Sequence, residues 1–276
     1  MARVRRIGAG AVAAACVLCL GALASHLSAG TSGRRGGPER AAPPATSAAD
    51  GIRRVATQEK AVALTLDDGP DPTYTPLVLD LARERRIALT FFVTGEHVRR
   101  YPRLVRRIHA EGHAIGNHTW SHEPMLGMSE AEDLAQMQAC AVEIKEVCGD
   151  QPRLFRPPKG KLDENVVRAA ASLGYTVVLW SIAVESHDAS TPQQMAERVV
   201  KKVQPGSIIL AHDGRRYERV SRDKTMAALP LLVEALQEQG YRFVTVPELL
   251  ALGARGPDAS GKPESAQRAH GRGSAT

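Results

Sequence analysis

Short apolar runs recur along the middle of the chain at intervals that predict buried β-strands. The first, residues 62–66, leads into an acidic turn, and similar runs follow it at comparable distances. Apolar runs bounded by Gly, Pro or charged residues are typical of strands that are covered on both faces. The seven predicted strands are residues 62–66, 89–93, 113–116, 154–156, 175–180, 207–210 and 241–246.

The segments between these strands show helical periodicity and helix-end signals. Residues 130–147 follow Ser129 and place Glu132 three positions after it, which is the pattern of a capping box. Residues 192–203 begin after Thr191, which is predicted to cap them. The other predicted helices are residues 75–86, 102–111, 163–173, 224–239 and 247–252.

Strands that alternate with helices predict an α/β fold with a parallel sheet. About seven such units within residues 59–253 favour a single domain that is a distorted or incomplete (β/α) barrel. An open doubly wound sheet is the alternative. Polar candidates for chemistry follow the ends of several predicted strands, which favours the barrel. The chain has neither a G-x-G-x-x-G fingerprint nor a Walker lysine loop.

The two ends of the chain differ in composition from its middle. Arg3, Arg5 and Arg6 precede an uncharged apolar stretch, so residues 1–28 are predicted to be a signal peptide or an N-terminal membrane anchor. Residues 29–58 and 254–276 are predicted to be a disordered linker and a disordered tail. We therefore expect a secreted protein, or one anchored to the outer face of the cytoplasmic membrane.

The basic excess of the chain, a formal net charge of +6, lies in these ends. Residues 1–60 carry nine Lys or Arg and three Asp or Glu, a net of +6, and residues 255–276 carry four and two, a net of +2. The middle is left with a net of −2, so the predicted domain is not a nucleic-acid binder on grounds of charge. Only the N-terminal segment predicts a membrane contact, and the oligomeric state is not readable.

Two adjacent carboxylates, Asp67 and Asp68, end the first predicted strand before Gly69-Pro70 turns the chain. Like charges this close resist joint ionisation unless a cation compensates them, so the pair predicts a metal. His118 and His122 are spaced to lie on one side of a helical turn. With one carboxylate they would form the ligand set of a catalytic zinc site. The same set occurs in non-haem iron oxygenases, an alternative that oxygen dependence would test.

Other polar residues divide into candidates for chemistry and residues with structural roles. Arg156 begins the stiff segment Arg156-Pro157-Pro158-Lys159-Gly160 and is able to hold a carboxylate through two hydrogen bonds. His212 follows a buried strand. The residues predicted to be structural are His97, His109 and His113, and Cys140 and Cys148 as two buried free thiols on one helix.

The sequence at this point resembles a known family. The segments Thr65-Leu66-Asp67-Asp68-Gly69-Pro70, His118-Thr119-Trp120-Ser121-His122, Arg156-Pro157-Pro158-Lys159-Gly160 and Leu210-Ala211-His212 look like the motifs of the polysaccharide deacetylases, carbohydrate esterase family four, with the nodulation-type deacetylase domain. The order and spacing match, and the resemblance covers about residues 60–250. It implies a distorted β/α barrel that removes acetyl groups from N-acetylated sugars such as chitooligosaccharide or peptidoglycan, or from O-acetylated xylan.

The resemblance also implies a role for each matching residue. Asp68, His118 and His122 would bind the metal, Zn²⁺ or another divalent ion such as Co²⁺. Asp67 would be the general base and His212 the general acid.

Four further residues have roles by the same resemblance. Arg156 would orient the base, and the backbone N–H near Lys159 would hold the oxyanion. Trp180 and Leu210 would form the walls of the pocket for the acetyl methyl group.

The sequence departs from the family pattern after Trp180, where Ala183 stands in place of a usual aspartate. We take the usual aspartate to tether Arg156, and Glu185 and Asp188 are the candidates to replace it. The departure leaves a second hypothesis open, that of a non-catalytic glycan-binding relative. The particular glycan is not readable from the sequence.

Overall fold

The computed structural model describes residues 51–215 and 220–255. The predicted signal segment, residues 29–50 of the predicted linker and the tail beyond residue 255 lie outside the described residues. Residues 52–55, which we predicted as part of the linker, belong to the domain. Ile52 N–H donates to the carbonyl of Val177 over 2.9 Å, and Val55 is buried and donates to Gly206. The domain therefore begins before the predicted residue 59, because Ile52 and Val55 pack against its core.

The first strand, β1 (Ala61–Asp67), is buried along its whole length. Its alternate residues Val62, Leu64 and Leu66 belong to the large apolar cluster that β1 forms with the helices. Ala61 and Ala63 belong to a second cluster on the opposite face, which includes residues of α8 (Val246–Ala254). Because side chains alternate along a strand, Asp67 continues the series of Ala61 and Ala63. It thus points to the inner face at the end of the strand.

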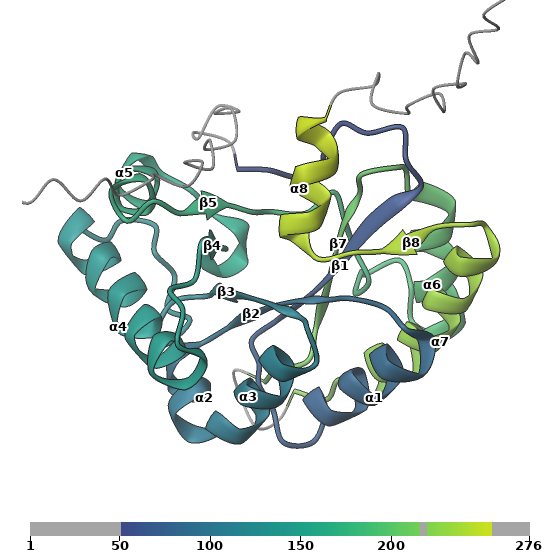
Figure 1. The fold of residues 1–276 in the computed structure, drawn as a ribbon, viewed down its shortest axis with the longest axis horizontal. Coiled ribbons are helices and arrows are strands. Elements are labelled where there is room, and N and C mark those ends of the chain that lie inside the picture. Colours follow the sequence, from purple (N-terminus) through teal and green to yellow (C-terminus); the bar gives the residue numbers. More distant parts are fainter. Residues whose placement is uncertain (1–50, 216–219, 256–276) are drawn as a thin grey trace, which may run out of the picture. The chain divides into compact units, whose positions relative to one another are not determined.

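All seven strand pairings that the structure describes are parallel, as the α/β pattern predicts. The strands run in the order β5-β4-β3-β2-β1-β7-β6, and β8 (Arg242–Phe243) pairs separately with the start of β1. Figure 1 shows β1 crossing the middle of the molecule with helices on both sides of the strands. The remaining strands are β2 (Thr90–Val93), β3 (Ala114–Asn117), β4 (Leu154–Phe155), β5 (Thr176–Val177), β6 (Ile182–Ala183) and β7 (Ile208–His212).

The predicted strand over residues 175–180 is shorter in the structure, and β6, a strand that was not predicted, follows it. Its start is β5, which pairs with β4 at one end of the strand order, and the chain then reaches β6, which pairs with β7 at the other end. One short segment thus joins both ends of the curved sheet. This is the incomplete barrel that the sequence predicts, because the strands curl around without a continuous ladder at the junction.

The helices occur where the pattern predicts them, with bounds that differ by one or two residues. Both predicted caps are present: the Ser129 side chain accepts from Glu132 N–H in a full capping box, and Thr191 forms the same arrangement with Gln194. A short helix, α2, was not predicted. The helices are α1 (Thr75–Arg85), α2 (Gly95–Arg100), α3 (Pro102–Ala110), α4 (Glu130–Cys148), α5 (Glu164–Ser172), α6 (Pro192–Lys202), α7 (Asp223–Glu238) and α8, with one 3-10 turn at Pro158–Gly160.

A further prediction concerns the cysteines. Cys140 and Cys148 both lie on α4 and are free thiols, as expected, although only Cys140 is fully buried. Within residues 51–215 and 220–255, the helices lack the combination of length and apolar character that crossing a bilayer requires.

Candidate active site

The predicted site residues meet where neighbouring parallel strands end. Asp67 ends β1 and pairs in register with His212, the last residue of β7. Asn117 ends β3, and His118 follows it directly. Arg156 follows β4. Since parallel strands end at the same edge of the sheet, four distant parts of the sequence supply side chains to one place.

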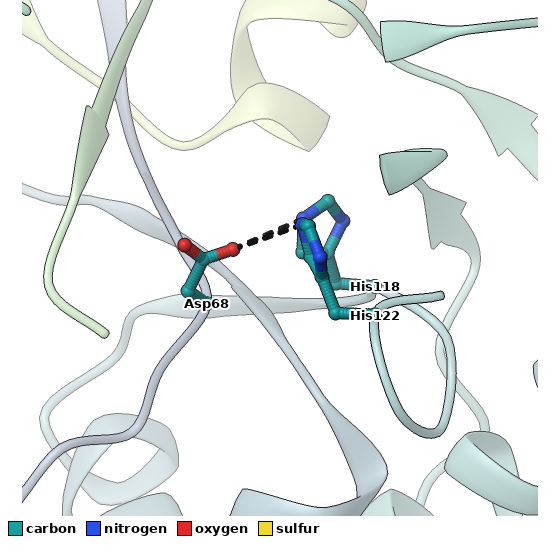
Figure 2. Close-up of side chains that lie close together, drawn as sticks. All are labelled: Asp68, His118 and His122. Atoms are coloured by element: carbon teal, nitrogen blue, oxygen red, sulfur yellow. Dashed lines mark ion pairs between the residues drawn. The ribbon is translucent and has the colours of Figure 1, made fainter. Parts of the chain in front are cut away.

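Among the described residues, Asp68, His118 and His122 are the one group of side chains placed to hold a metal ion, with ligand atoms all within 4.8 Å of one another. Oδ1 of Asp68 lies 3.5 Å from Nε2 of His118 and 3.3 Å from Nε2 of His122. Figure 2 shows this oxygen directed at the two imidazoles, while the other carboxylate oxygen points away from them. Asp68 and His118 are buried, and His122 is nearly so.

The backbone brings these ligands together by an unusual local conformation. Residues 118–122 form a loop, so our prediction of a helical turn is wrong. Thr119 and His122 have positive φ values of 69° and 57°, and Thr119 Oγ1 accepts from the His122 N–H over 3.0 Å. Asp68 also has a positive φ of 71°. Left-handed backbone at three positions of one site is strained for residues other than glycine, and such strain is typical of functional sites.

The donor set fits a divalent metal ion. Oδ1 of Asp68 is buried without a hydrogen-bond donor, yet it faces two imidazole nitrogens. Nδ1 of His118 lies 2.7 Å from the carbonyl oxygen of Arg156, which holds the ring so that Nε2 faces Asp68. Although burial opposes ionisation, the nearby imidazoles of His118, His212 and His122 hold the pKa of Asp68 well below its usual range. An ionised carboxylate and two imidazoles are ligands that zinc accepts.

Asp67 is held apart from this group by Arg156. The Arg156 guanidinium is fully buried and donates from NH1 to Oδ1 of Asp67 over 2.6 Å and to Thr65 over 2.8 Å. Its other donors reach the carbonyl oxygens of Val178 and Leu179 over 3.1 and 3.0 Å. Oδ2 of Asp67 lies 3.7 Å from Nε2 of His118. Asp67 therefore has one oxygen fixed by the guanidinium and the other facing His118.

His212 has a carboxylate behind it. Its Nδ1 lies 3.2 Å from Oε2 of Glu185, and both side chains are partly exposed. Burial lowers the pKa of His212, but Glu185, Asp68 and Asp67 outweigh it, so the pKa lies above its ordinary value. A histidine with a raised pKa remains protonated over a wider pH range, which suits a proton donor.

These contacts correct our prediction for the departure at Ala183. Neither Glu185 nor Asp188 tethers Arg156, whose described partners are Asp67, Thr65 and two backbone carbonyls. Glu185 instead pairs with His212, and Asp188 is largely exposed and pairs with Arg198. The prediction was wrong because a buried arginine is satisfied by backbone oxygens, which leave no mark in a sequence pattern.

The three residues predicted to bind substrate lie near this edge. Lys159 is exposed in the 3-10 turn after Arg156, with φ of 59°. The Trp180 ring packs on Gly160, where an added Cβ would lie 2.5 Å from it, and lies 5.7 Å from the Arg156 guanidinium. Leu210 is buried in β7 opposite Thr65. Their roles toward the acetyl group and the oxyanion stay predictions.

Sequence reasoning missed several residues at the site. Thr65 was detectable, because strand alternation places it on the face of Asp67. His97 was taken as structural, yet its Nδ1 lies 2.7 Å from the carbonyl oxygen of Asp68. Arg222 donates to Oδ2 of Asp68 over 3.1 Å. No local signal marks Arg222 or His97, since each reaches Asp68 only through the fold.

Comparisons with known proteins identify a family of similar sequences. Residues 54–178 match the profile of the family described as polysaccharide deacetylase. A peptidoglycan-N-acetylglucosamine deacetylase of Bacillus cereus is 43% identical over 198 residues, which cover 71% of this chain and 91% of the relative. A chitooligosaccharide deacetylase of Sinorhizobium fredii is 35% identical, with 71% and 95% covered.

Solved structures with a similar fold belong to the same group of proteins. The crystal structure of a peptidoglycan N-acetylglucosamine deacetylase superposes with a TM-score of 0.68 at 32% identity, covering 71% of this chain and 91% of that one. The structure of a Bacillus anthracis pseudoenzyme of the same family superposes with a TM-score of 0.67 at 27% identity, covering 74% and 70%. The fold therefore occurs both with and without catalysis.

Proposed function

The chain belongs to the polysaccharide deacetylase family, and on that premise we propose that it is a metal-dependent hydrolase that removes acetyl groups from N-acetylated glycans. The observation that supports this most is the meeting of Asp67, Asp68, His118, His122 and His212 at one edge of the sheet. Chitooligosaccharide and the N-acetylglucosamine of peptidoglycan are the proposed substrates, because similar proteins carry those names. O-acetylated xylan is the alternative.

Asp68, His118 and His122 would hold the metal, which we propose to be Zn²⁺, with Co²⁺ as a substitute. Such an ion, when bound, lowers the pKa of a bound water and polarises the acetyl carbonyl. The two imidazole nitrogens and one carboxylate oxygen leave further positions for water and substrate.

Asp67 is suited to take the proton of the attacking water. Oδ2 of Asp67 lies 3.7 Å from Nε2 of His118, which is too far for a hydrogen bond. Arg156 fixes the orientation of the Asp67 carboxylate through the other oxygen. General-base action of this kind contributes about 10²–10⁴-fold to a rate. Arg156 is a positioning residue here, because it acts through Asp67.

His212 lies across from Asp67 and is suited to protonate the departing amine. Glu185 keeps the imidazole oriented and favours its charged form. A backbone N–H near Lys159 would stabilise the negative charge that develops on the acetyl oxygen, where loss of one donor costs about 3 kcal/mol. Trp180 and Leu210 would line the pocket for the methyl group.

A non-catalytic glycan-binding role is the second candidate, because a pseudoenzyme shares the fold and Ala183 departs from the family pattern. The structure favours catalysis over this reading. Arg156 orients the base, the carbonyl oxygen of Arg156 orients His118, and Glu185 supplies the carboxylate for His212.

We also propose that the protein is exported, because Arg3, Arg5 and Arg6 precede an apolar segment in the sequence. An acetylated cell-wall glycan would then be within reach. Fractionation of cells that express the tagged full chain tests this, and an intracellular location would contradict it.

The test of the activity is acetate release by the full chain from chitooligosaccharides, peptidoglycan and acetylated xylan, each with and without added Zn²⁺. Asp67→Asn is expected to keep its metal and to release acetate at least about 10²-fold more slowly. Asp188→Asn is the matched control, since that carboxylate is 63% exposed and lies outside the site. Glycan binding without acetate release would support the non-catalytic role instead.

A further inference from the structure

Arg222 lies just before α7, 154 positions in the sequence from Asp68, which it contacts. Its side chain is only 15% exposed. Its Nε donates to the carbonyl oxygen of Gly214 over 2.9 Å, and its NH2 donates to Oδ2 of Asp68 over 3.1 Å. Its NH1 lies 3.9 Å from Oε1 of Glu185. One guanidinium therefore lies between two carboxylates that serve different halves of the site.

The two oxygens of Asp68 have different partners. Oδ1 faces the imidazoles of His118 and His122, whereas Oδ2 accepts the hydrogen bond from Arg222. A hydrogen bond to one carboxylate oxygen turns the other oxygen toward the imidazoles and favours metal binding through that other oxygen. Figure 2 shows the two oxygens directed to opposite sides.

Glu185 is divided in the same manner. Oε1 accepts from Thr225 Oγ1 over 2.8 Å and lies near Arg222, while Oε2 faces Nδ1 of His212. Arg222 and Thr225 are three residues apart at the start of α7. The N-terminal end of this helix thus holds both Glu185 and Asp68.

The backbone near Asp68 leaves little freedom to compensate. An added Cβ at Gly214 would lie 2.0 Å from the carbonyl carbon and oxygen of Asp68, so the two backbones are in close contact. His97 lies against the same carbonyl oxygen. The main chain of Asp68 is therefore held in place, and Arg222 is the described hydrogen-bond donor to its carboxylate.

We propose that Arg222 is a positioning residue that restricts Asp68 to one metal-binding oxygen and, through Glu185, keeps His212 in place. This rests on the proposed metal site and adds a residue that links it to the proton donor. A planar guanidinium with several donors can hold two carboxylates at once, which a lysine ammonium cannot do in the same geometry.

The test compares the full-length protein with Arg222→Met, Arg222→Lys and, as control, Lys224→Met. Lys224 is exposed in the first turn of the same helix, so its replacement removes one positive charge beside the site without removing a described contact. Co²⁺ serves as the probe, with its dissociation constant measured by titration and its ligand number read from the visible absorption spectrum.

Arg222→Met is expected to bind Co²⁺ about 10–100-fold more weakly, as is typical when a group that orients a ligand is lost. Its spectrum should shift toward a higher coordination number, because both oxygens of Asp68 become free. Where acetate release is measurable, kcat should fall while KM stays close to that of the unchanged protein. Arg222→Lys should lie between the two, and Lys224→Met should match the unchanged protein.

An unchanged Co²⁺ affinity and spectrum in Arg222→Met would overturn the proposal. So would a rise in KM alone, which would make Arg222 a substrate contact. If Arg222→Met does not fold, Arg222→Lys decides in the same way. Because Co²⁺ binding needs no turnover, a protein that binds Co²⁺ through Arg222-oriented Asp68 but releases no acetate would refute only the proposed function.

Discussion

Replacement of Arg156 by lysine tests how the site depends on a single buried side chain. Arg156 makes four hydrogen bonds in two directions, and its guanidinium also lies 4.0 Å from the centroid of the Phe92 ring. Lysine keeps the positive charge that Asp67 needs, but its donors radiate from one nitrogen. It cannot reach Asp67 and the carbonyl oxygens of Val178 and Leu179 together.

The expected cost follows from the groups that lose a donor. Each buried carbonyl left without one costs about 1–3 kcal/mol, and a disturbed buried ion pair costs about 3–5 kcal/mol. These effects overlap, so we expect Arg156→Lys to lower the free energy of unfolding by about 3–5 kcal/mol. For a domain of this size the corresponding fall in Tm is roughly 6–20 °C.

Catalysis should suffer separately from stability. Asp67 keeps a charged neighbour but loses its fixed orientation, so kcat is expected to fall by at least about 10². Co²⁺ affinity should stay unchanged, because the Arg156 side chain contacts none of the metal-ligand candidates and the carbonyl that orients His118 is retained. The assays are thermal unfolding, acetate release and Co²⁺ titration.

Arg153→Lys is the matched control, since Arg153 is exposed three residues before Arg156. It should leave all three measurements unchanged. The reasoning is refuted if Arg156→Lys unfolds within about 2 °C of the unchanged protein and keeps its kcat, because the four contacts would then contribute neither stability nor orientation.

The remaining predictions concern pH, buried charge and metal removal. Glu185 raises the pKa of His212, so activity that needs protonated His212 is lost as pH rises through that pKa. Glu185→Gln should therefore move the basic limb of the kcat/KM profile to lower pH. A basic limb that stays in place would exclude an effect of Glu185 on His212. Burial raises the pKa of Asp133 to about 6, so the folded state loses stability as pH rises from about 4 to 6. Asp133→Asn, followed by urea unfolding at pH 4 and pH 7, should flatten this dependence and stabilise the protein at pH 7 by about 1–3 kcal/mol; a steeper dependence would contradict the assignment. Treatment with a chelator should abolish acetate release and lower the free energy of unfolding by about 2.7 kcal/mol relative to the protein with metal at 100 times its Kd. Added Zn²⁺ or Co²⁺ should restore both. An unchanged Tm and unchanged acetate release would argue against a metal.

The sequence determined the parts of this protein that depend on local chemistry. Apolar runs and helix-end signals gave the order of strands and helices, because burial and capping act over a few residues. Asp67, Asp68, His118 and His122 were identifiable because short segments combine them with turns, and the resemblance gave roles to the candidates Arg156 and His212. The alternation along β1 also carried the position of Thr65, although it was not used.

Other features were decided only by the tertiary structure. β5 and β6 follow each other in the sequence yet pair at opposite ends of the strand order, which depends on which strands lie beside them. The pairing of Glu185 with His212, and not with Arg156, depends on where backbone carbonyls satisfy the guanidinium. Arg222 reaches Asp68 across 154 positions of sequence. Such contacts leave no local pattern, because the position of each partner is set by the packing of the whole domain.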